Sequence, residues 1–169
     1  MPDARRWFFD TVVLSNFALA QRLDIVIRRY GRRAHIPQEV LAEISNGIAA
    51  GYAPLQGVEE AVAERRLTAA KPLTAGERTD YRQLLRSLSS GEAACIACAR
   101  SRGGIVATDD RAARAGAGEH GVPVTGTVGI LKASCLDASL TADDADTVLA
   151  DMVRAGFYSP VARISDLLP

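Results

Sequence analysis

Short apolar runs alternate with longer helical segments along the chain. Runs of three or four mostly apolar residues indicate buried strands, and they lie at residues 7–9, 34–36, 67–70, 105–108 and 122–124. Apolar residues spaced three and four apart predict amphipathic helices at residues 14–30 (two short helices), 37–48, 58–65, 74–88, 89–102, 111–120, 127–134 and 142–155, with a last turn near 164–168. This alternation predicts an α/β fold in which helices cover both faces of a central, mostly parallel sheet.

The local signals at helix ends agree with these boundaries. Pro37 suits the first position of a helix, where its missing N–H has no partner to lose. Ser89 or Ser90 can cap the helix that follows, and Glu92 lies in its first turn, where a carboxylate suits the helix dipole. The chain of 169 residues contains no internal repeat, low-complexity tract or linker. A single domain over residues 1–169 is therefore expected, and a domain of this length buries about two-thirds of its unfolded surface.

Composition changes this picture little. Hydrophobic residues make up 48% of the chain and charged residues 24%, and the formal net charge is zero, so bulk charge does not point to nucleic acid. Four arginine pairs nevertheless occur, and arginine can grip phosphate with two hydrogen bonds; a GC-rich genome explains such pairs equally well. The pairs are Arg5–Arg6, Arg28–Arg29, Arg32–Arg33 and Arg65–Arg66.

The cysteines and histidines carry no predicted chemistry. Cys95 and Cys98 lie in an alanine-rich helical segment, which favours buried thiols over a redox or zinc motif, and Cys135 is also expected in the core. His35 and His120 are far apart in sequence, so both are interpreted as structural or surface residues.

The sequence predicts a soluble cytoplasmic protein that does not contact membranes. It has three cysteines without a secretory segment, and it has no apolar run of the roughly 18 residues that a membrane span needs.

Acidic residues recur where predicted strands end. Asp10 follows the first strand, and Asp109 and Asp110 follow the strand at 105–108. Glu43 lies on the helix after the second strand, and Glu92 begins the helix that leads into the strand before Asp109. In an open parallel sheet, ligands bind outside the carboxyl ends of the strands. These acids are therefore expected to converge on one edge of the sheet.

Gathered carboxylates repel one another unless a cation neutralises them. Oxygen ligands favour Mg²⁺ or Mn²⁺, and such ions beside a phosphodiester can generate the attacking hydroxide and stabilise the leaving oxygen. Each acid also has a purely structural interpretation. Asp10, Asp109 and Asp110 can cap the helices that follow, Glu43 can be a solvated helix residue, and Glu92 can simply complement its helix dipole.

Four sequence blocks resemble the PIN-domain superfamily in their order and spacing. They are Phe9-Asp10-Thr11-Val12-Val13-Leu14-Ser15-Asn16-Phe17-Ala18, Ile36-Pro37-Gln38-Glu39-Val40-Leu41-Ala42-Glu43-Ile44, Gly91-Glu92-Ala93-Ala94-Cys95-Ile96-Ala97-Cys98-Ala99 and residues 105–114. The continuation over residues 121–131 and the C-terminal residues 155–168 are similar to a PIN branch found beside toxin–antitoxin proteins. The resemblance implies a three-layer α/β/α domain that cleaves RNA with Mg²⁺ or Mn²⁺. It also implies a VapC-like toxin with a small antitoxin partner, and a homodimer.

Carried over by position, the resemblance makes Asp10, Glu43, Glu92 and Asp110 the catalytic, metal-binding acids. Thr11, Ser15, Asn16 and Thr108 become polar neighbours that orient a carboxylate or a water. The chain departs from the commonest pattern in two places. The third acid is Glu92 where Asp is usual, and Asp109 stands directly before Asp110, so either of these two can face the metal. Arg111 and Arg114 near the same edge are expected to hold phosphates of the substrate.

The sequence thus predicts a metal-dependent endoribonuclease that hydrolyses RNA phosphodiesters and leaves a 5′-phosphate. The long segment between Ile44 and Leu88 motivates an alternative, a PIN-like module that binds RNA or protein with little or no catalysis. A phosphatase with an Asp-x-Asp motif is disfavoured because Val12 stands where the second acid would be, and no Walker A loop is present.

Overall fold

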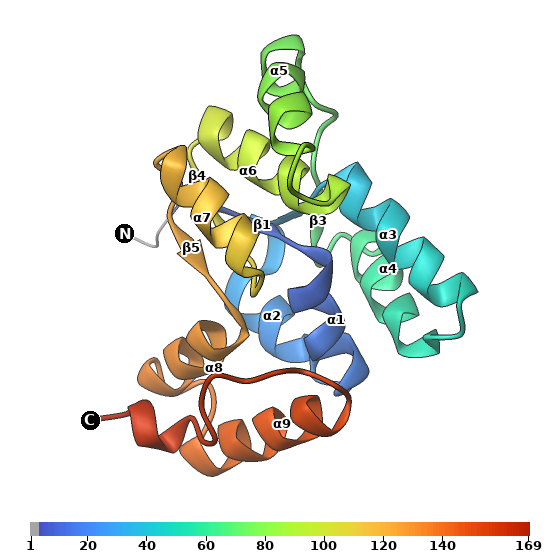
Figure 1. Ribbon diagram of the computed structural model, residues 1–169. Helices are drawn as coiled ribbons and strands as arrows, with labels where there is room; N and C mark the ends of the chain where they lie inside the picture. Colours follow the sequence, from blue (N-terminus) through green and yellow to red (C-terminus); the bar gives the residue numbers. More distant parts are fainter. Residues whose placement is uncertain (1–3) are drawn as a thin grey trace.

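A computed structural model describes residues 4–169 and places a parallel sheet at the centre of the molecule (Figure 1). Within these residues the sheet has five strands in the order β3-β2-β1-β4-β5, and each neighbouring pair runs parallel. The expected mostly parallel sheet is thus parallel throughout. The strands are β1 (Arg6–Phe9), β2 (Ala34–Ile36), β3 (Thr68–Ala69), β4 (Gly104–Ala107) and β5 (Val124–Thr125).

The strand order places a topological switch between β1 and β4. From β1 the chain builds outward through β2 and β3 on one side, whereas β4 and β5 extend the sheet on the other. Phe9 pairs with Ala107 at the carboxyl ends of β1 and β4, and the N–H of Asp10 donates to Ala107 O at 2.9 Å. The residues that leave β1 and β4 therefore emerge side by side, at the crevice where α/β sheets of this kind bind ligands.

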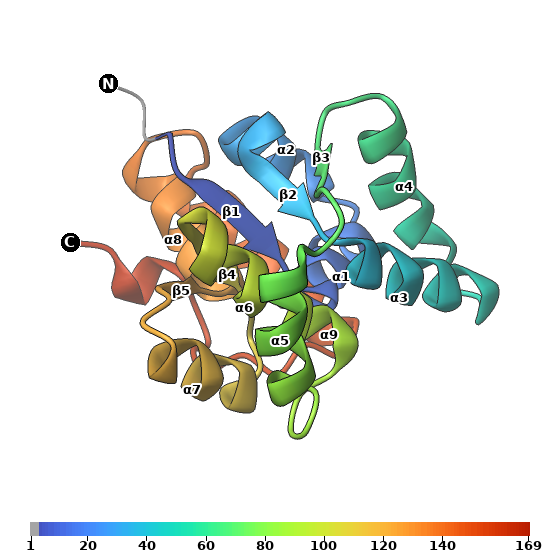
Figure 2. The same cartoon turned by 90° about the horizontal axis from the view of Figure 1, so that it is seen from above.

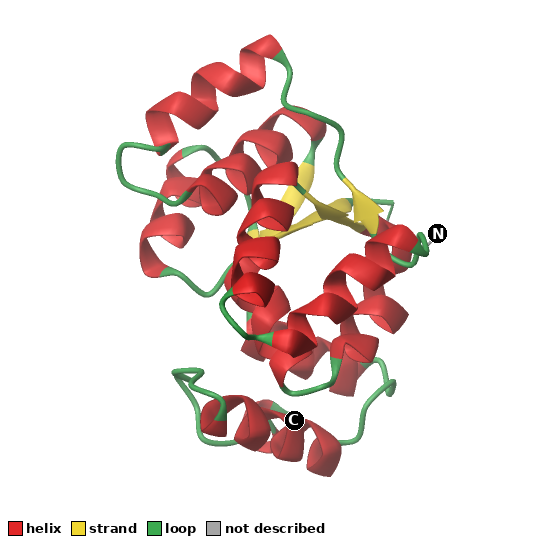
Figure 3. Ribbon diagram, turned by 90° about the vertical axis from the view of Figure 1, so that its right-hand side faces the viewer, coloured by secondary structure: helices red, strands yellow, loops and turns green. Residues whose placement is uncertain are grey.

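Helices cover both faces of the sheet and form three layers (Figures 1 and 2). Helices α5, α6 and α7 lie on one face, and α1, α2 and α8 lie on the other, with α9 packed outside α1 and α8. Figure 3 shows the strands enclosed between these helices. The helices are α1 (Thr11–Leu19), α2 (Leu23–Tyr30), α3 (Gln38–Ala49), α4 (Gln56–Ala63), α5 (Ala75–Leu84), α6 (Ser90–Arg102), α7 (Arg111–Glu119), α8 (Thr127–Leu136) and α9 (Ala142–Arg154), with short 3₁₀ turns η1 (Gly31–Arg33), η2 (Ala53–Leu55) and η3 (Ser165–Leu167).

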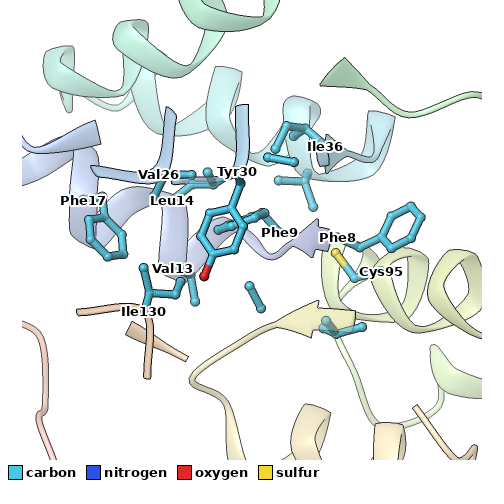
Figure 4. Close-up of a cluster of buried hydrophobic side chains, with 14 of the residues drawn as sticks. Phe8, Phe9, Val13, Leu14, Phe17, Val26, Tyr30, Ile36, Cys95 and Ile130 are labelled. Atoms are coloured by element: carbon cyan, nitrogen blue, oxygen red, sulfur yellow. The ribbon is translucent and has the colours of Figure 1, made fainter. Parts of the chain in front are cut away.

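The hydrophobic core is centred on β1 (Figure 4). Phe8 and Phe9 are consecutive strand residues, so their side chains point to opposite faces, and both are fully buried. The Phe9 ring packs against Tyr30 of α2 with ring centroids 5.2 Å apart, and Phe8 therefore faces α6, which packs on β1. Burial at such positions contributes about 2 kcal/mol per large side chain, so β1 fixes the direction of the residue that follows it.

Helix α6 is buried on almost every side because it lies between the sheet and the helices α3, α5 and α7. Its small residues from Ala93 to Ala99 permit this close packing. Cys95 and Cys98 are buried within it, as expected, and burial raises the pKa of the Cys98 thiol to about 12. No helix within residues 4–169 is both long enough and apolar enough to cross a membrane.

Several element ends differ from the sequence expectation, and two of them are the end of α5 and the start of β5. Helix α5 ends at Leu84, and the next residues form a turn in which Ser87 N donates to Leu84 O at 3.2 Å. Strand β5 begins at Val124, later than expected, because Pro123 has no N–H for the ladder and contributes only its carbonyl, which accepts from Val106 N. Neither difference moves the ends of β1 or β4.

Candidate active site

Asp10 is a buried carboxylate at the switch point. It leaves β1 directly, caps the N-terminus of α1 and is 1% exposed. The N–H of Thr11 donates to its Oδ1 at 2.6 Å, and the hydroxyl of Thr108, the residue that leaves β4, donates to its Oδ2 at 3.1 Å. Both donors are neutral, and none of the ion pairs within residues 4–169 includes Asp10. A buried carboxylate without a cation is costly, so this one calls for a functional explanation.

The charges of two other acids act on Asp10. Burial, followed by repulsion from Glu92 and more weakly from Glu43, raises the pKa of Asp10 from 3.8 to about 7, although hydrogen bonds from Thr11 and Thr108 oppose the shift. The charges of Glu92 and Glu43 thus both act on the Asp10 carboxylate. Their mutual repulsion is what a bound cation would relieve.

Glu43 is held across two helices by three donors. From α3 its carboxylate reaches the start of α6, where Oε1 accepts from the hydroxyl of Ser90 at 3.0 Å and from the N–H of Gly91 at 2.6 Å. Its Oε2 accepts from the hydroxyl of Thr11 at 2.8 Å. Thr11 is thus one of the orienting neighbours expected from the sequence. Ser90 and Gly91 were not predicted, because their role depends on how α3 packs against α6.

Gly91 is required by the position of Glu43. A Cβ atom at residue 91 would lie 2.5 Å from Oε1 of Glu43, which is closer than real Cβ contacts come. The glycine permits the carboxylate to reach the unpaired N–H groups at the start of α6, where the helix dipole also favours negative charge. The sequence signal that could have indicated this role is the position of Gly91, directly before an acidic residue at a predicted helix start.

Glu92 combines a structural role with its place in the acidic neighbourhood. Ser89 and Glu92 form a capping box, in which Ser89 N donates to Glu92 Oε2 at 3.0 Å and Glu92 N donates to Ser89 Oγ at 3.3 Å. Of the two capping candidates, Ser89 therefore caps the helix, and Ser90 binds Glu43 instead. The capping box uses only Oε2 of Glu92, so Oε1 takes no part in it.

The adjacent acids Asp109 and Asp110 have different surroundings. Asp109 accepts from the N–H of Thr127 at 2.8 Å, from the Thr127 hydroxyl at 2.5 Å and from Nδ2 of Asn16 at 3.1 Å. It thereby joins the end of β4 to the start of α8 and to α1. Asp110 caps α7, with Oδ1 accepting from Ala113 N at 2.8 Å, and its Oδ2 lies outside this cap. Asp109 is thus the more structural of the two.

The remaining expected residues fall into two groups. Asn16 and Thr108 contact acids directly, as stated above. The Ser15 side chain makes no hydrogen bond to an acid within the described part of the chain. Arg114 is half-buried on α7, where its Nε donates to Thr108 O at 3.1 Å, and Arg111 is exposed at the start of the same helix. Thr127, which binds Asp109, was not predicted.

The donor type of this site suits a hard divalent cation. Asp10, Glu43, Glu92 and Asp110 offer carboxylate oxygens, the ligands that Mg²⁺ and Mn²⁺ prefer, and Asp10 is buried without a positive charge. As the side chains stand, no three acidic, histidine or cysteine groups of residues 4–169 are gathered closely enough to hold one ion. Each of these carboxylates is held by protein donors instead.

The fold and the acids at its switch point define an α/β/α protein with an acidic site. A family model described as a PIN domain matches residues 6–169, and the chain therefore belongs to the PIN-domain family. Nuclease activity is common in this family, and its members generally use divalent metal ions. The sequence resemblance and the three-layer α/β/α fold are thus confirmed.

Among solved structures, the chain is similar to one described as "Crystal structure of PAE2754 from Pyrobaculum aerophilum". The two chains are 15% identical, and the alignment covers 73% of this chain and 91% of that one, with a TM-score of 0.47. No curated protein matches the chain.

Proposed function

We propose that this protein is a metal-dependent endoribonuclease that hydrolyses RNA phosphodiester bonds. The observation that carries the proposal is the carboxylate of Asp10, buried at the switch point beside Glu43 and Glu92 with no cationic partner within residues 4–169. A stable fold would avoid such an arrangement unless a cation or a reaction required it. Membership of a family in which nucleases are common supports the same conclusion.

In this proposal Asp10, Glu43, Glu92 and Asp110 would hold Mg²⁺ or Mn²⁺. Such an ion, when bound, would supply activation of water and stabilisation of charge on the phosphate oxygens. The protein fixes the carboxylates beforehand, with Thr11 and Thr108 as the orienting donors. Arg111 and Arg114 hold flanking phosphates through their guanidinium groups.

The test is cleavage of a labelled single-stranded RNA by the purified chain with Mg²⁺ or Mn²⁺ and with EDTA. Cleavage that stops with EDTA and falls at least 100-fold in Asp10→Asn supports the proposal. Asp24→Asn is the matched control, because Asp24 is a partly exposed carboxylate paired with Arg22 and Arg28 away from the site. Undiminished cleavage by Asp10→Asn would refute the assignment.

The structure also offers an observation for the alternative, a PIN-like module that binds RNA or protein without catalysis. Each acid already has protein donors, and no three of them in the described chain are grouped around a common point. Titration calorimetry separates the two functions. Binding of Mn²⁺ that disappears in Asp10→Asn favours the nuclease, whereas no binding at millimolar Mn²⁺ favours the module.

The toxin role, the antitoxin partner and the homodimer are part of the same proposal and rest on the sequence resemblance. A small reading frame beside this gene whose product inhibits cleavage would support the first two. Light scattering coupled to size-exclusion chromatography tests the dimer, which would have twice the 18.0 kDa mass of the chain.

A further inference from the structure

A pocket of about 580 Å³ opens beside Asp109, the residue that precedes Asp110. Its lining comes from α7, β5, the start of α8 and the segment after α9, and it includes Arg111, Arg114, Val124, Gly126, Phe157 and Tyr158. Arg114 connects the pocket to the site, since it donates to Thr108 O, and the hydroxyl of Thr108 donates to Asp10. The volume lies in the range of roughly 300–1,000 Å³ that is usual for small-molecule and cofactor sites.

The charge of this pocket suits an anion. Arg111 and Arg114 are three residues apart on α7 and therefore lie on the same side of the helix. Neither guanidinium takes part in an ion pair within residues 4–169. The one acid in the lining, Asp109, directs its carboxylate to Thr127 and Asn16.

Tyr158 lines the pocket with an aromatic side chain that is scarcely buried in the fold. Its side chain is 93% exposed, on the segment that returns from the end of α9 toward η3 (Figure 1). The backbone on both sides is anchored, because Phe157 N donates to Met152 O at 2.9 Å and the hydroxyl of Ser159 donates to Val161 O at 2.6 Å. Because the backbone is held, binding a flat partner orders only the two side-chain torsions of this ring.

We infer that this pocket seats one nucleotide of a single-stranded RNA next to the reacting phosphate. The base stacks on Tyr158, and a phosphate lies against Arg111 and Arg114. The choice of RNA rests on the proposed function, whereas the stacking surface and the two cations are features of the pocket itself. Aromatic stacking combined with a basic groove is how proteins hold single strands without reading their sequence.

The experiment measures binding apart from cleavage. A fluorescein-labelled 12-nucleotide oligouridylate is titrated with protein in EDTA, and the dissociation constant is read from fluorescence anisotropy. Tyr158→Ala should weaken binding by roughly 5- to 100-fold, as expected for the loss of one stacked base. Tyr158→Phe keeps the ring and should stay within about twofold of wild type. Tyr52→Ala is the matched control, because Tyr52 is also exposed (55%) and lies outside the pocket lining.

A second oligonucleotide, with abasic riboses in place of uridines, shows whether the base is the partner. It should bind wild type about as weakly as the normal strand binds Tyr158→Ala, and the variant should not distinguish the two strands.

Equal affinities of wild type and Tyr158→Ala for oligouridylate would overturn the inference, as would no binding by wild type. RNA binding that depends on Tyr158 without any cleavage would refute the nuclease but support the pocket. Cleavage and binding that both ignore Tyr158 would refute the pocket alone.

Discussion

The carboxylate of Glu43 accepts a hydrogen bond from the backbone N–H of Gly91 at 2.6 Å. This bond joins α3 to the first turn of α6, and its two residues are 48 positions apart in the sequence. It also fixes one acid of the candidate site by means of a main-chain group, whose position is set by the helix rather than by a flexible side chain. The orientation of Glu43 thus depends on residue 91 having no side chain.

Gly91→Ala is therefore expected to impair catalysis by displacing Glu43. The added methyl group would lie 2.5 Å from Oε1, so the carboxylate must shift, and misplacement by about 1 Å can cost on the order of 100-fold in rate. We expect RNA cleavage to fall about 10- to 100-fold. Gly76→Ala on α5 is the control, because a Cβ there meets nothing within 4 Å. Unchanged cleavage by Gly91→Ala would contradict the dependence of catalysis on a Glu43 carboxylate fixed by Gly91.

The sequence predicted those parts of the site that depend on local pattern. Asp10 and Asp110 follow short apolar runs, and a buried parallel strand determines where its last residue points. A cap at Ser89 or Ser90 and the place of Glu92 in the first helical turn were also predicted, whereas the capping box between Ser89 and Glu92 emerged only from the structure. In contrast, the bond from Ser90 to Glu43 depends on how two distant helices pack, which no local pattern contains.

The same distinction explains Thr127 and Tyr158. Thr127 meets Asp109 because β5 lies next to β4 and α8 begins directly after β5. Tyr158 reaches the pocket because the chain turns back after α9. Both relationships follow from tertiary structure, so composition and periodicity did not single these residues out.

Asp10 should destabilise the metal-free protein above neutral pH. Because its pKa is raised from 3.8 to about 7, the folded state keeps a proton that the unfolded state has lost between these values. Stability therefore falls as the pH rises through this window, by about 4 kcal/mol at most for a shift of this size. Asp10→Asn removes the charge and should unfold at a higher temperature than wild type at pH 8 in EDTA.

At pH 4 the two proteins should unfold at similar temperatures, because wild-type Asp10 is then protonated in the folded state. Asp24→Asn provides the comparison, since this partly exposed residue should change stability by less than about 1 kcal/mol at either pH. Thermal unfolding followed by circular dichroism measures all three chains. Equal stability of wild type and Asp10→Asn at pH 8 would contradict the uncompensated charge on which the proposed function rests.

Arg102 and Glu77 form a buried ion pair away from the acids of the candidate site. Glu77 is 2% exposed, and both its oxygens bind the guanidinium, at 2.9 Å and 2.7 Å. The hydrogen bond from Arg102 lowers the pKa of Glu77 to about 2. Arg102→Ala leaves this carboxylate buried without a cation and should cost about 3–5 kcal/mol of unfolding free energy at pH 7.

Urea unfolding measures this cost, with Arg100→Ala as the control on the same helix. Arg100 pairs with Asp80 at the surface and should contribute less than about 1 kcal/mol. Because the pKa of Glu77 is lowered from 4.5, the contribution of the pair is complete above that pH and disappears as the pH falls toward 2. A constant difference between wild type and Arg102→Ala from pH 7 to pH 2 would contradict this interpretation.

Asparagine substitutions distinguish the roles of Asp109 and Asp110. Asparagine caps helices about as well as aspartate, so Asp110→Asn should leave stability within about 0.5 kcal/mol and, under the proposed function, reduce cleavage at least tenfold. Asp109→Asn places an amide donor among Thr127 and Asn16, which already donate to this position. It should lower the unfolding free energy by about 1–3 kcal/mol. The reverse result, loss of cleavage with unchanged stability in Asp109→Asn alone, would make Asp109 the acid that faces the metal.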